Sequence, residues 1–173
     1  MTDASKWIWL NTRGRSSVLD LGAGLLYSSL NIHQSVPWVG GIEVYAPYLE
    51  KARHPTIDYH AICGDMTEWR RLVPADFVPD CSMMIDTLEH IERRAALDFV
   101  SDLQTSFNLI LLFVPIGEHP QNSDAWEMGN DFHQTHKSTW YETDIREMGF
   151  DGYIERGFHG EKGDAMFATW ERE

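Results

Sequence analysis

The chain has few cysteines, no long hydrophobic run and a deficit of basic residues. Its two cysteines, Cys63 and Cys81, lack CxxC spacing, so we expect buried free thiols. The longest apolar run, residues 109–114, is far too short to cross a bilayer, and the first residues do not resemble a signal peptide. The sequence therefore predicts a cytoplasmic protein with no membrane partner.

Basic residues are scarce relative to acidic ones. Lysine and arginine total 14 against 27 aspartates and glutamates, which gives a formal net charge of −13. A surface of this sign repels phosphate backbones, and no cluster of basic residues offsets it locally. The composition argues against nucleic acid as a partner and favours a neutral or cationic one.

The rest of the composition is that of a folded protein. Hydrophobic residues make up 43% of the 173-residue chain and aromatic residues 12%, whereas disordered chains are poor in both. This length is enough for one full domain and short for two. No repeat or low-complexity linker divides the sequence, so we expect a single domain over residues 1–173.

Short apolar runs alternate with turns and helical stretches along the chain. The five runs expected to form strands are residues 18–21, 38–44, 59–63, 81–85 and 109–114. Between the last two, Ala96, Phe99, Val100 and Leu103 recur at helical spacing. Strands that alternate with helices predict an α/β fold with a parallel sheet covered on both faces.

The C-terminal part predicts a helix followed by a hairpin. Thr139 and Glu142 have the spacing of a capping box, and Gly149 lies where a helix would stop, which predicts a helix over residues 139–148. Residues 152–158 and 165–170 then flank the turn-like segment 160–163. We expect them to form an antiparallel pair of strands.

Candidate ligand-binding residues follow four of the predicted strands. Ligands of open parallel sheets bind beyond the carboxyl ends of the strands, near the point where the strand order reverses. The residues where these strands end are Asp20, Gly22 and Gly24 for the first strand, Glu43 for the second, Asp65 and Met66 for the third, and Asp86 for the fourth. The glycines permit a tight turn close to a ligand, and Glu43 could accept hydrogen bonds from a ribose. Each signal is weak alone, but four at regular spacing favour a nucleotide-type site.

These residues carry a family resemblance. The segment 18–24, Val-Leu-Asp-Leu-Gly-Ala-Gly, resembles the first motif of class I S-adenosylmethionine (SAM)-dependent methyltransferases. Segments 41–44, 63–66 and 85–91 resemble their second, third and fourth motifs, and segment 136–150 resembles the helix that leads into their closing hairpin. The resemblance covers nearly the whole chain. One departure is Leu26, which replaces the usual third glycine of the first motif.

The resemblance implies a three-layer α/β/α sandwich whose seven-stranded, mostly parallel sheet has an antiparallel last strand. It also implies a SAM-dependent methyltransferase that acts on a small-molecule or protein acceptor. The implied cofactor-binding residues are Asp20, Gly22, Gly24, Glu43, Val44, Asp65, Met66 and Asp86. Methyl transfer chiefly requires two reactants to be positioned, and a base only if the acceptor must lose a proton.

Four histidines fall after the fourth and fifth strands, where an acceptor would bind. His90, His119 and His136 are weak candidates for a general base, and the alternative is that they are helix-start, exposed or capping residues. We expect no metal site, because no HxxxH pair is present, although His133 and His136 are close in sequence. The long segment 116–136 is a candidate acceptor-binding loop, in which Trp126, Met128 and Phe132 form either an apolar wall or a plug over the core.

Two other functions fit parts of the pattern. An NAD(P)-dependent oxidoreductase would also place Glu43 after a glycine-rich turn, but Tyr27 occupies the last glycine position of GxGxxG. A methyltransferase fold that has lost activity and serves as a binding protein would tolerate Leu26. The oligomeric state does not follow from the sequence.

Overall fold

The computed structural model describes residues 3–52, 59–160 and 163–173. Seven strands form one sheet in the order β3-β2-β1-β4-β5-β7-β6. The chain divides into two compact units, Met1–Met83 and Met84–Glu173, and strand β4, Cys81–Ile85, leads from the first unit into the second.

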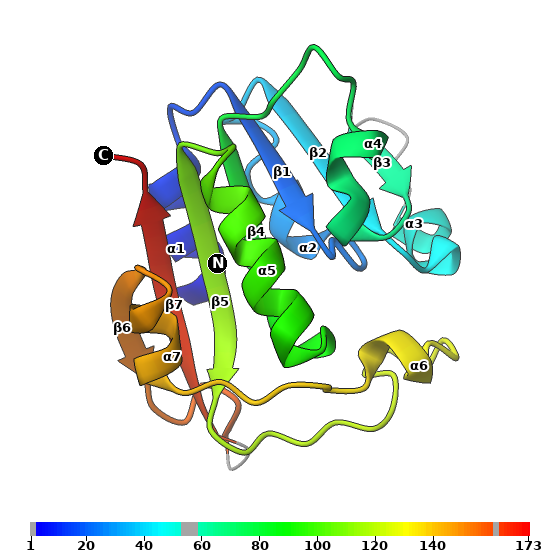
Figure 1. Ribbon diagram of the computed structural model, residues 1–173. Coiled ribbons are helices and arrows are strands. Elements are labelled where there is room, and N and C mark those ends of the chain that lie inside the picture. The colour runs from blue at the N-terminus through cyan, green and yellow to red at the C-terminus, as the bar shows by residue number, and fades with distance from the viewer. Residues whose placement is uncertain (1–2, 53–58, 161–162) are drawn as a thin grey trace. The chain divides into compact units, whose positions relative to one another are not determined.

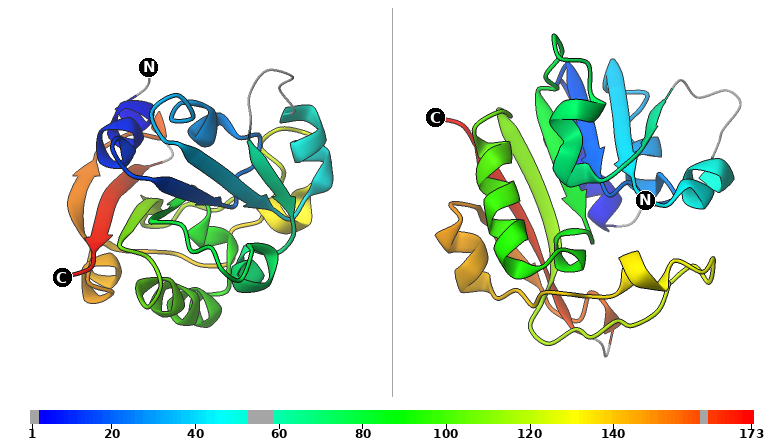
Figure 2. Two further views of the ribbon diagram at one scale, coloured as in Figure 1. Left: turned by 90° about the horizontal axis from the view of Figure 1, so that it is seen from above. Right: turned by 45° about the vertical axis from the view of Figure 1, so that its right-hand side comes forward.

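The first unit is built from parallel strands and short helices. Its elements are α1 (Asp3–Thr12), β1 (Ser17–Leu21), α2 (Tyr27–Leu30), β2 (Trp38–Glu43), α3 (Ala46–Ala52), β3 (His60–Cys63), the 3₁₀ helix η1 (Met66–Glu68) and α4 (Trp69–Leu72). Strand β1 runs parallel to β2 on one side and to β4 on the other (Figure 1). Helices α1 and α2 lie on one face of these strands and α4 on the opposite face (Figure 2).

Burial on both faces explains the composition of β1. All five of its residues are buried, and so are five of the six residues of β2. A strand covered on both faces requires a continuous apolar run rather than alternation, which is the pattern that predicted it. The exception is Asp20, a carboxylate within the buried strand.

The second unit contains the η2 turn (Leu88–His90), α5 (Arg93–Gln104), β5 (Leu109–Ile116), α6 (Asp131–Gln134), α7 (Glu142–Glu147), β6 (Asp151–Glu155) and β7 (Asp164–Glu171). Strand β7 runs antiparallel to both β5 and β6. The buried residues of α5 include the four that predicted the helix. The seven-stranded sheet, parallel except for β7 and flanked by helices, confirms the predicted α/β fold.

Two details of the sequence-based prediction are wrong. The last helix begins at Glu142 rather than Thr139, because the Thr139 and Trp140 carbonyls accept hydrogen bonds from Arg93 and from the Gly117 amide instead of starting a helix. The guanidinium of Arg93, at the start of α5, lies over the Trp140 ring, 4.8 Å from its centroid. Cys81 is buried as expected, but Cys63 is exposed, since β3 lies at the edge of the sheet.

The predicted C-terminal pair of strands is confirmed, with Tyr153 opposite Phe167. Two residues of the segment expected to connect them, Glu161 and Lys162, lie outside the described residues. Among the helices that the structure describes, none combines the length and apolar character needed to cross a membrane.

Candidate functional site

The carboxyl ends of β1, β2 and β3 lie at one edge of the first unit. Their parallel register pairs Leu21 with Ile42 and Glu43 with Cys63, so the three strands end at nearly the same level. The fold therefore brings together the predicted residues at the end of each strand: Gly22 and Gly24, Glu43 and Val44, Asp65 and Met66. The strand order reverses between β1 and β4, which is where ligands of open α/β sheets bind.

The glycines of the turn after β1 have positive φ angles, in the left-handed region. Gly22 has φ 77° and Gly24 has φ 53°, a conformation that costs glycine little and other residues about 1–2 kcal/mol. The amides of Gly22 and Ala23 both donate to the Ile42 carbonyl, at 2.9 and 3.0 Å, which fastens the turn to β2. The two glycines were singled out for this reason, and the backbone confirms that they form a tight turn.

Leu26 also has a left-handed backbone conformation, although it is not a glycine. It has φ 63° and ψ 14°, immediately before α2. Its side chain is only 4% exposed and packs with Ala23 and Leu49. The position of the missing glycine thus keeps the backbone conformation that a glycine would adopt, and apolar packing offsets the conformational cost.

Glu43 links the ends of β1 and β2. Its Oε2 accepts a hydrogen bond from the Gly24 amide at 2.9 Å, and its Oε1 accepts one from the Tyr45 amide at 2.8 Å. The residue is 6% exposed, and burial raises the pKa of its carboxyl while the backbone donors oppose this shift. Each carboxylate oxygen has a second lone pair, so Glu43 retains acceptor capacity for a ligand.

Asp20 lies beneath the turn rather than on its surface. It is 1% exposed, and Oδ2 accepts a hydrogen bond of 2.5 Å from the Ser29 hydroxyl. The Tyr59 hydroxyl lies 3.1 Å from the Ser29 hydroxyl. Burial raises the pKa of Asp20 to about 7. The Ser29 hydrogen bond opposes this shift, and the nearby Glu43 charge adds to it.

The sequence-based reasoning missed Ser29 and Tyr59 as members of this polar cluster. The signal that could have found Tyr59 is Gly41, because a Cβ there would lie 1.7 Å from the Tyr59 hydroxyl. Gly41 therefore leaves the space that this ring occupies. Asp20 supports the turn through Ser29, and its predicted contact with a cofactor stays a prediction.

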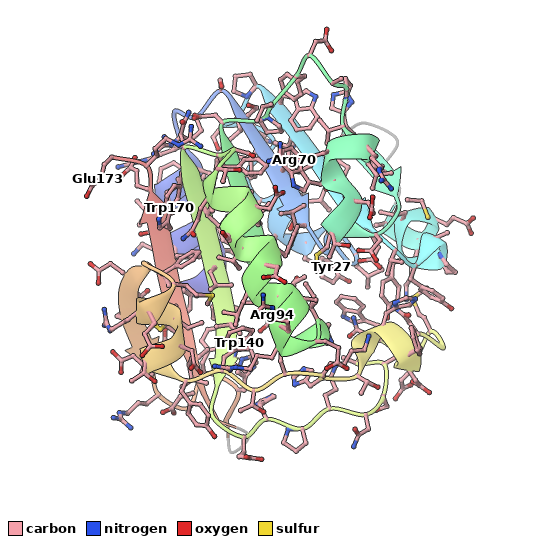
Figure 3. The ribbon with its side chains drawn as sticks, viewed as in Figure 1. Tyr27, Arg70, Arg94, Trp140, Trp170 and Glu173 are labelled. Carbon is pink, nitrogen blue, oxygen red and sulfur yellow. The ribbon has the colours of Figure 1, made fainter. Side chains whose placement is uncertain are left out.

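Asp65 and Val44 complete the edge of the first unit. Asp65 is exposed, and its Oδ1 accepts hydrogen bonds from the amide and hydroxyl of Thr67, at 2.9 and 2.8 Å, so it caps η1. Val44 is 39% exposed, a large value for an apolar side chain directly after a buried strand. Met66 is half-buried. The edge thus presents carboxylates beside apolar side chains. Figure 3 shows Tyr27 just beyond the end of β1.

The second unit holds a separate group of histidines and carboxylates. One possible ligand atom each from Glu89, His90 and His136 lies within 4.8 Å of the others. The fold assembles this group because the amides of Lys137 and Ser138 donate to the Glu89 carbonyl, at 2.8 and 3.1 Å. No local sequence pattern predicts this contact between residues almost 50 positions apart.

Backbone carbonyls hold both imidazoles of this group. Nδ1 of His136 lies 2.5 Å from the His119 carbonyl oxygen, and Nδ1 of His90 lies 3.3 Å from that of Thr135. Burial lowers the pKa of both histidines, that of His90 to about 4. The His119 and His136 rings stack at 5.5 Å, so the structure brings the three predicted histidines into one cluster.

Asp86 follows β4 and has φ 49°, a left-handed conformation that aspartate tolerates better than most residues. Its Oδ1 lies 3.7 Å from Nε2 of His159, a residue that the sequence-based reasoning missed. His159 in turn packs against His119, with ring centroids 4.9 Å apart. The predicted role of Asp86 in cofactor binding stays a prediction.

Comparisons with known proteins identify the fold through solved structures rather than through sequence. No family model matches the sequence, and no curated protein is similar enough in sequence to match. Among solved structures, TehB from Haemophilus influenzae aligns over 92% of this chain and 58% of its own, with 11% identity and a TM-score of 0.68. The small RNA methyltransferase HEN1 aligns over 98% of this chain and 25% of its own, with 13% identity and a TM-score of 0.68.

A third neighbour was solved with bound SAM. Magnesium protoporphyrin IX methyltransferase (ChlM) from Synechocystis PCC 6803 aligns over 97% of this chain and 76% of its own, with 15% identity and a TM-score of 0.67. This chain spans little more than half of TehB and a quarter of HEN1. The protein has the fold of the class I SAM-dependent methyltransferases.

Proposed function

We propose that the protein is a SAM-dependent methyltransferase that binds its cofactor at the carboxyl ends of β1, β2 and β3. The observation that carries this proposal is the hydrogen bond between the Glu43 carboxylate and the turn after β1. A buried carboxylate at the end of β2 accepts the Gly24 amide and still has lone pairs for the hydroxyls of a ribose. The fold of the SAM-binding neighbours supports the same cofactor.

The residues of this edge fit the parts of SAM. The left-handed turn at Gly22 and Gly24 has no Cβ atoms in the way of the cofactor's amino-acid tail. Glu43 would accept the ribose hydroxyls, and Asp65 the adenine amino group. Val44 and Met66 supply apolar contact for the adenine ring. When bound, SAM supplies a methyl group on a positively charged sulfonium, which becomes a neutral thioether when the group is transferred.

The acceptor is proposed to be a neutral or cationic small molecule or protein side chain. The net charge of −13 repels a polyanion. We propose that segment 116–136 selects this acceptor. Within it, the Asp124 carboxylate accepts hydrogen bonds from the amides of Trp126, Met128 and Asn130, at 2.8 to 3.1 Å, so the segment is a structured loop. Phe132, at 74% exposure, is open to contact rather than a plug over the core.

Calorimetry with S-adenosylhomocysteine (SAH), the demethylated product, tests the proposal through Glu43. Glu43→Gln keeps one oxygen acceptor but loses the charge, and Glu43→Ala loses both. Loss of charge-assisted hydrogen bonds costs about 1.5–3 kcal/mol, so Glu43→Ala should weaken SAH binding roughly ten- to hundred-fold, with Glu43→Gln in between. Asp65→Ala should weaken it less, because the apolar contacts to adenine remain.

The matched control is Glu50→Gln, at an exposed glutamate of α3 in the same unit. It should bind SAH like the unmodified protein. Because Glu43 also accepts two backbone amides, each variant is first melted, and affinities are compared well below the lowest melting temperature. Unchanged SAH affinity in a folded Glu43→Ala protein would show that the ribose does not bind at the end of β2.

A further inference from the structure

We propose that Glu89, His90 and His136 form a binding site for a divalent transition-metal ion. This assignment departs from the sequence-based expectation of no metal, which considered only residues close together in sequence. It concerns the second unit alone and does not depend on the proposed methyltransferase activity.

The Glu89 carboxylate lacks a partner that its burial requires. The residue is 2% exposed, and its Oε2 has no hydrogen-bond partner among the described residues. A buried polar atom left without a hydrogen bond costs about 1–3 kcal/mol, and more when it is charged. Its other oxygen, Oε1, lies 3.9 Å from Nε2 of His136. A cation beside Oε2 would supply the missing partner.

The two imidazoles are oriented as metal ligands usually are. A carbonyl oxygen only accepts hydrogen bonds, so the Nδ1 atoms beside the His119 and Thr135 carbonyls must carry the proton. The lone pair of each ring then lies on Nε2. Metal-bound histidines commonly donate their other nitrogen to a backbone carbonyl in this way, which fixes the tautomer and the ring. In His136 the unprotonated nitrogen is the one that points toward Glu89.

The distances permit a metal after small side-chain movements. Zinc lies about 2.0–2.2 Å from histidine nitrogen and carboxylate oxygen, so donor atoms in a tetrahedral site are roughly 3.4 Å apart. The three donor atoms here all lie within 4.8 Å of one another, and the Glu89–His136 pair is at 3.9 Å. The backbone hydrogen bonds to the Glu89 carbonyl hold the two segments together without a metal. Rotation of three side chains would therefore close the site.

The donor set indicates the class of ion. Two imidazoles and one carboxylate suit zinc, cobalt, iron or nickel, whereas magnesium prefers oxygen ligands and keeps its waters. Three protein ligands also leave one position or more for water or for an oxygen-bearing molecule. We therefore expect Zn²⁺ and Co²⁺ to bind more tightly than Mg²⁺.

The test titrates Zn²⁺, Co²⁺ and Mg²⁺ into full-length protein freed of metal with a chelator, without SAM or SAH. Zn²⁺ binding is followed by calorimetry, and Co²⁺ binding by the intensity of its visible absorption, which reports nitrogen ligands and a low coordination number. The variants are Glu89→Gln and His136→Gln, which preserve side-chain size. The control is His33→Gln, because His33 lies in the first unit and contacts the Leu30 carbonyl.

The unmodified protein and His33→Gln should bind one Zn²⁺ per chain and give the same cobalt spectrum. Each ligand variant should lose more than the roughly 10–100-fold in affinity that removal of an outer partner costs. Thermal melts with chelator check that the variants fold. If Glu89→Gln does not fold, His90→Gln replaces it. The proposal is overturned if the unmodified protein shows no saturable Zn²⁺ binding, if folded ligand variants bind like the control, or if Mg²⁺ displaces Zn²⁺.

Discussion

Leu26 offers a quantitative test of the turn that replaces the usual third glycine. We consider two substitutions, Leu26→Ala and Leu26→Gly. Both remove a side chain that is 4% exposed and packed against Ala23 and Leu49, and such losses cost about 2–5 kcal/mol in the free energy of unfolding. They differ in how the remaining residue tolerates φ 63°.

The left-handed conformation costs alanine about 1–2 kcal/mol and glycine almost nothing. Leu26→Gly should therefore be more stable than Leu26→Ala by about 1 kcal/mol. The order is opposite in a regular helix, where glycine is about 1 kcal/mol less stable than alanine. Leu97, in the interior of α5, provides the matched control pair, for which alanine should be the more stable substitute.

Urea denaturation followed by circular dichroism measures all four variants. Equal m-values would show that each pair unfolds from and to comparable states, so that the midpoints can be compared. The reasoning is refuted if Leu26→Ala is as stable as Leu26→Gly while the Leu97 pair behaves as expected. In that case Leu26 does not hold the left-handed conformation, and the turn differs from the glycine-containing motif.

Three further predictions concern the turn, the buried carboxylate and the loop. Gly24→Asn places a side chain in the proposed cofactor space, and asparagine tolerates the φ of 53° at this position. We expect SAH affinity to fall at least about tenfold and the free energy of unfolding to fall by no more than about 1 kcal/mol. A loss of stability as large as the loss of binding free energy would mean that Gly24 only shapes the turn. Asp20 keeps its proton to about pH 7 when folded but releases it near pH 3.8 when unfolded, so its contribution to stability falls as pH rises between these values. Asp20→Asn should make the free energy of unfolding, measured by urea titration, depend less on pH across that window. An unchanged pH dependence would contradict the raised pKa of Asp20. Phe132→Ala should change stability and SAH affinity little, because the ring is 74% exposed, yet should reduce methylation of an acceptor in an assay with labelled SAM; full methylation would place the acceptor elsewhere.

Local patterns predicted most of the strands and one helix correctly. The buried face of α5 follows directly from the spacing of its apolar residues, and β1 follows from an apolar run that ends at glycines. The start of α7 was wrong because long-range contacts decided it. Arg93 binds the Thr139 carbonyl across 46 positions of sequence, and no local rule includes such a partner.

The candidate site was predictable only in part for the same reason. Residues that follow parallel strands must share an edge, so Gly24, Glu43 and Asp65 could be placed together from the sequence. The residues that form hydrogen bonds with the site residues could not be predicted from the sequence. Ser29 donates a hydrogen bond to Asp20, and the Tyr59 hydroxyl lies beside that of Ser29. The backbone of the segment after α6 brings His136 to Glu89.

The central claim is that the edge formed by β1, β2 and β3 binds SAM. Calorimetry of the unmodified protein with SAH and, in a parallel titration, with NAD tests this claim most directly, because both ligands contain an adenosine whose ribose Glu43 could accept. We expect SAH to bind at one site per chain and NAD to give no measurable heat of binding. Binding of NAD in preference to SAH would contradict the claim and favour an oxidoreductase, and binding of neither would show that the fold is retained without its cofactor.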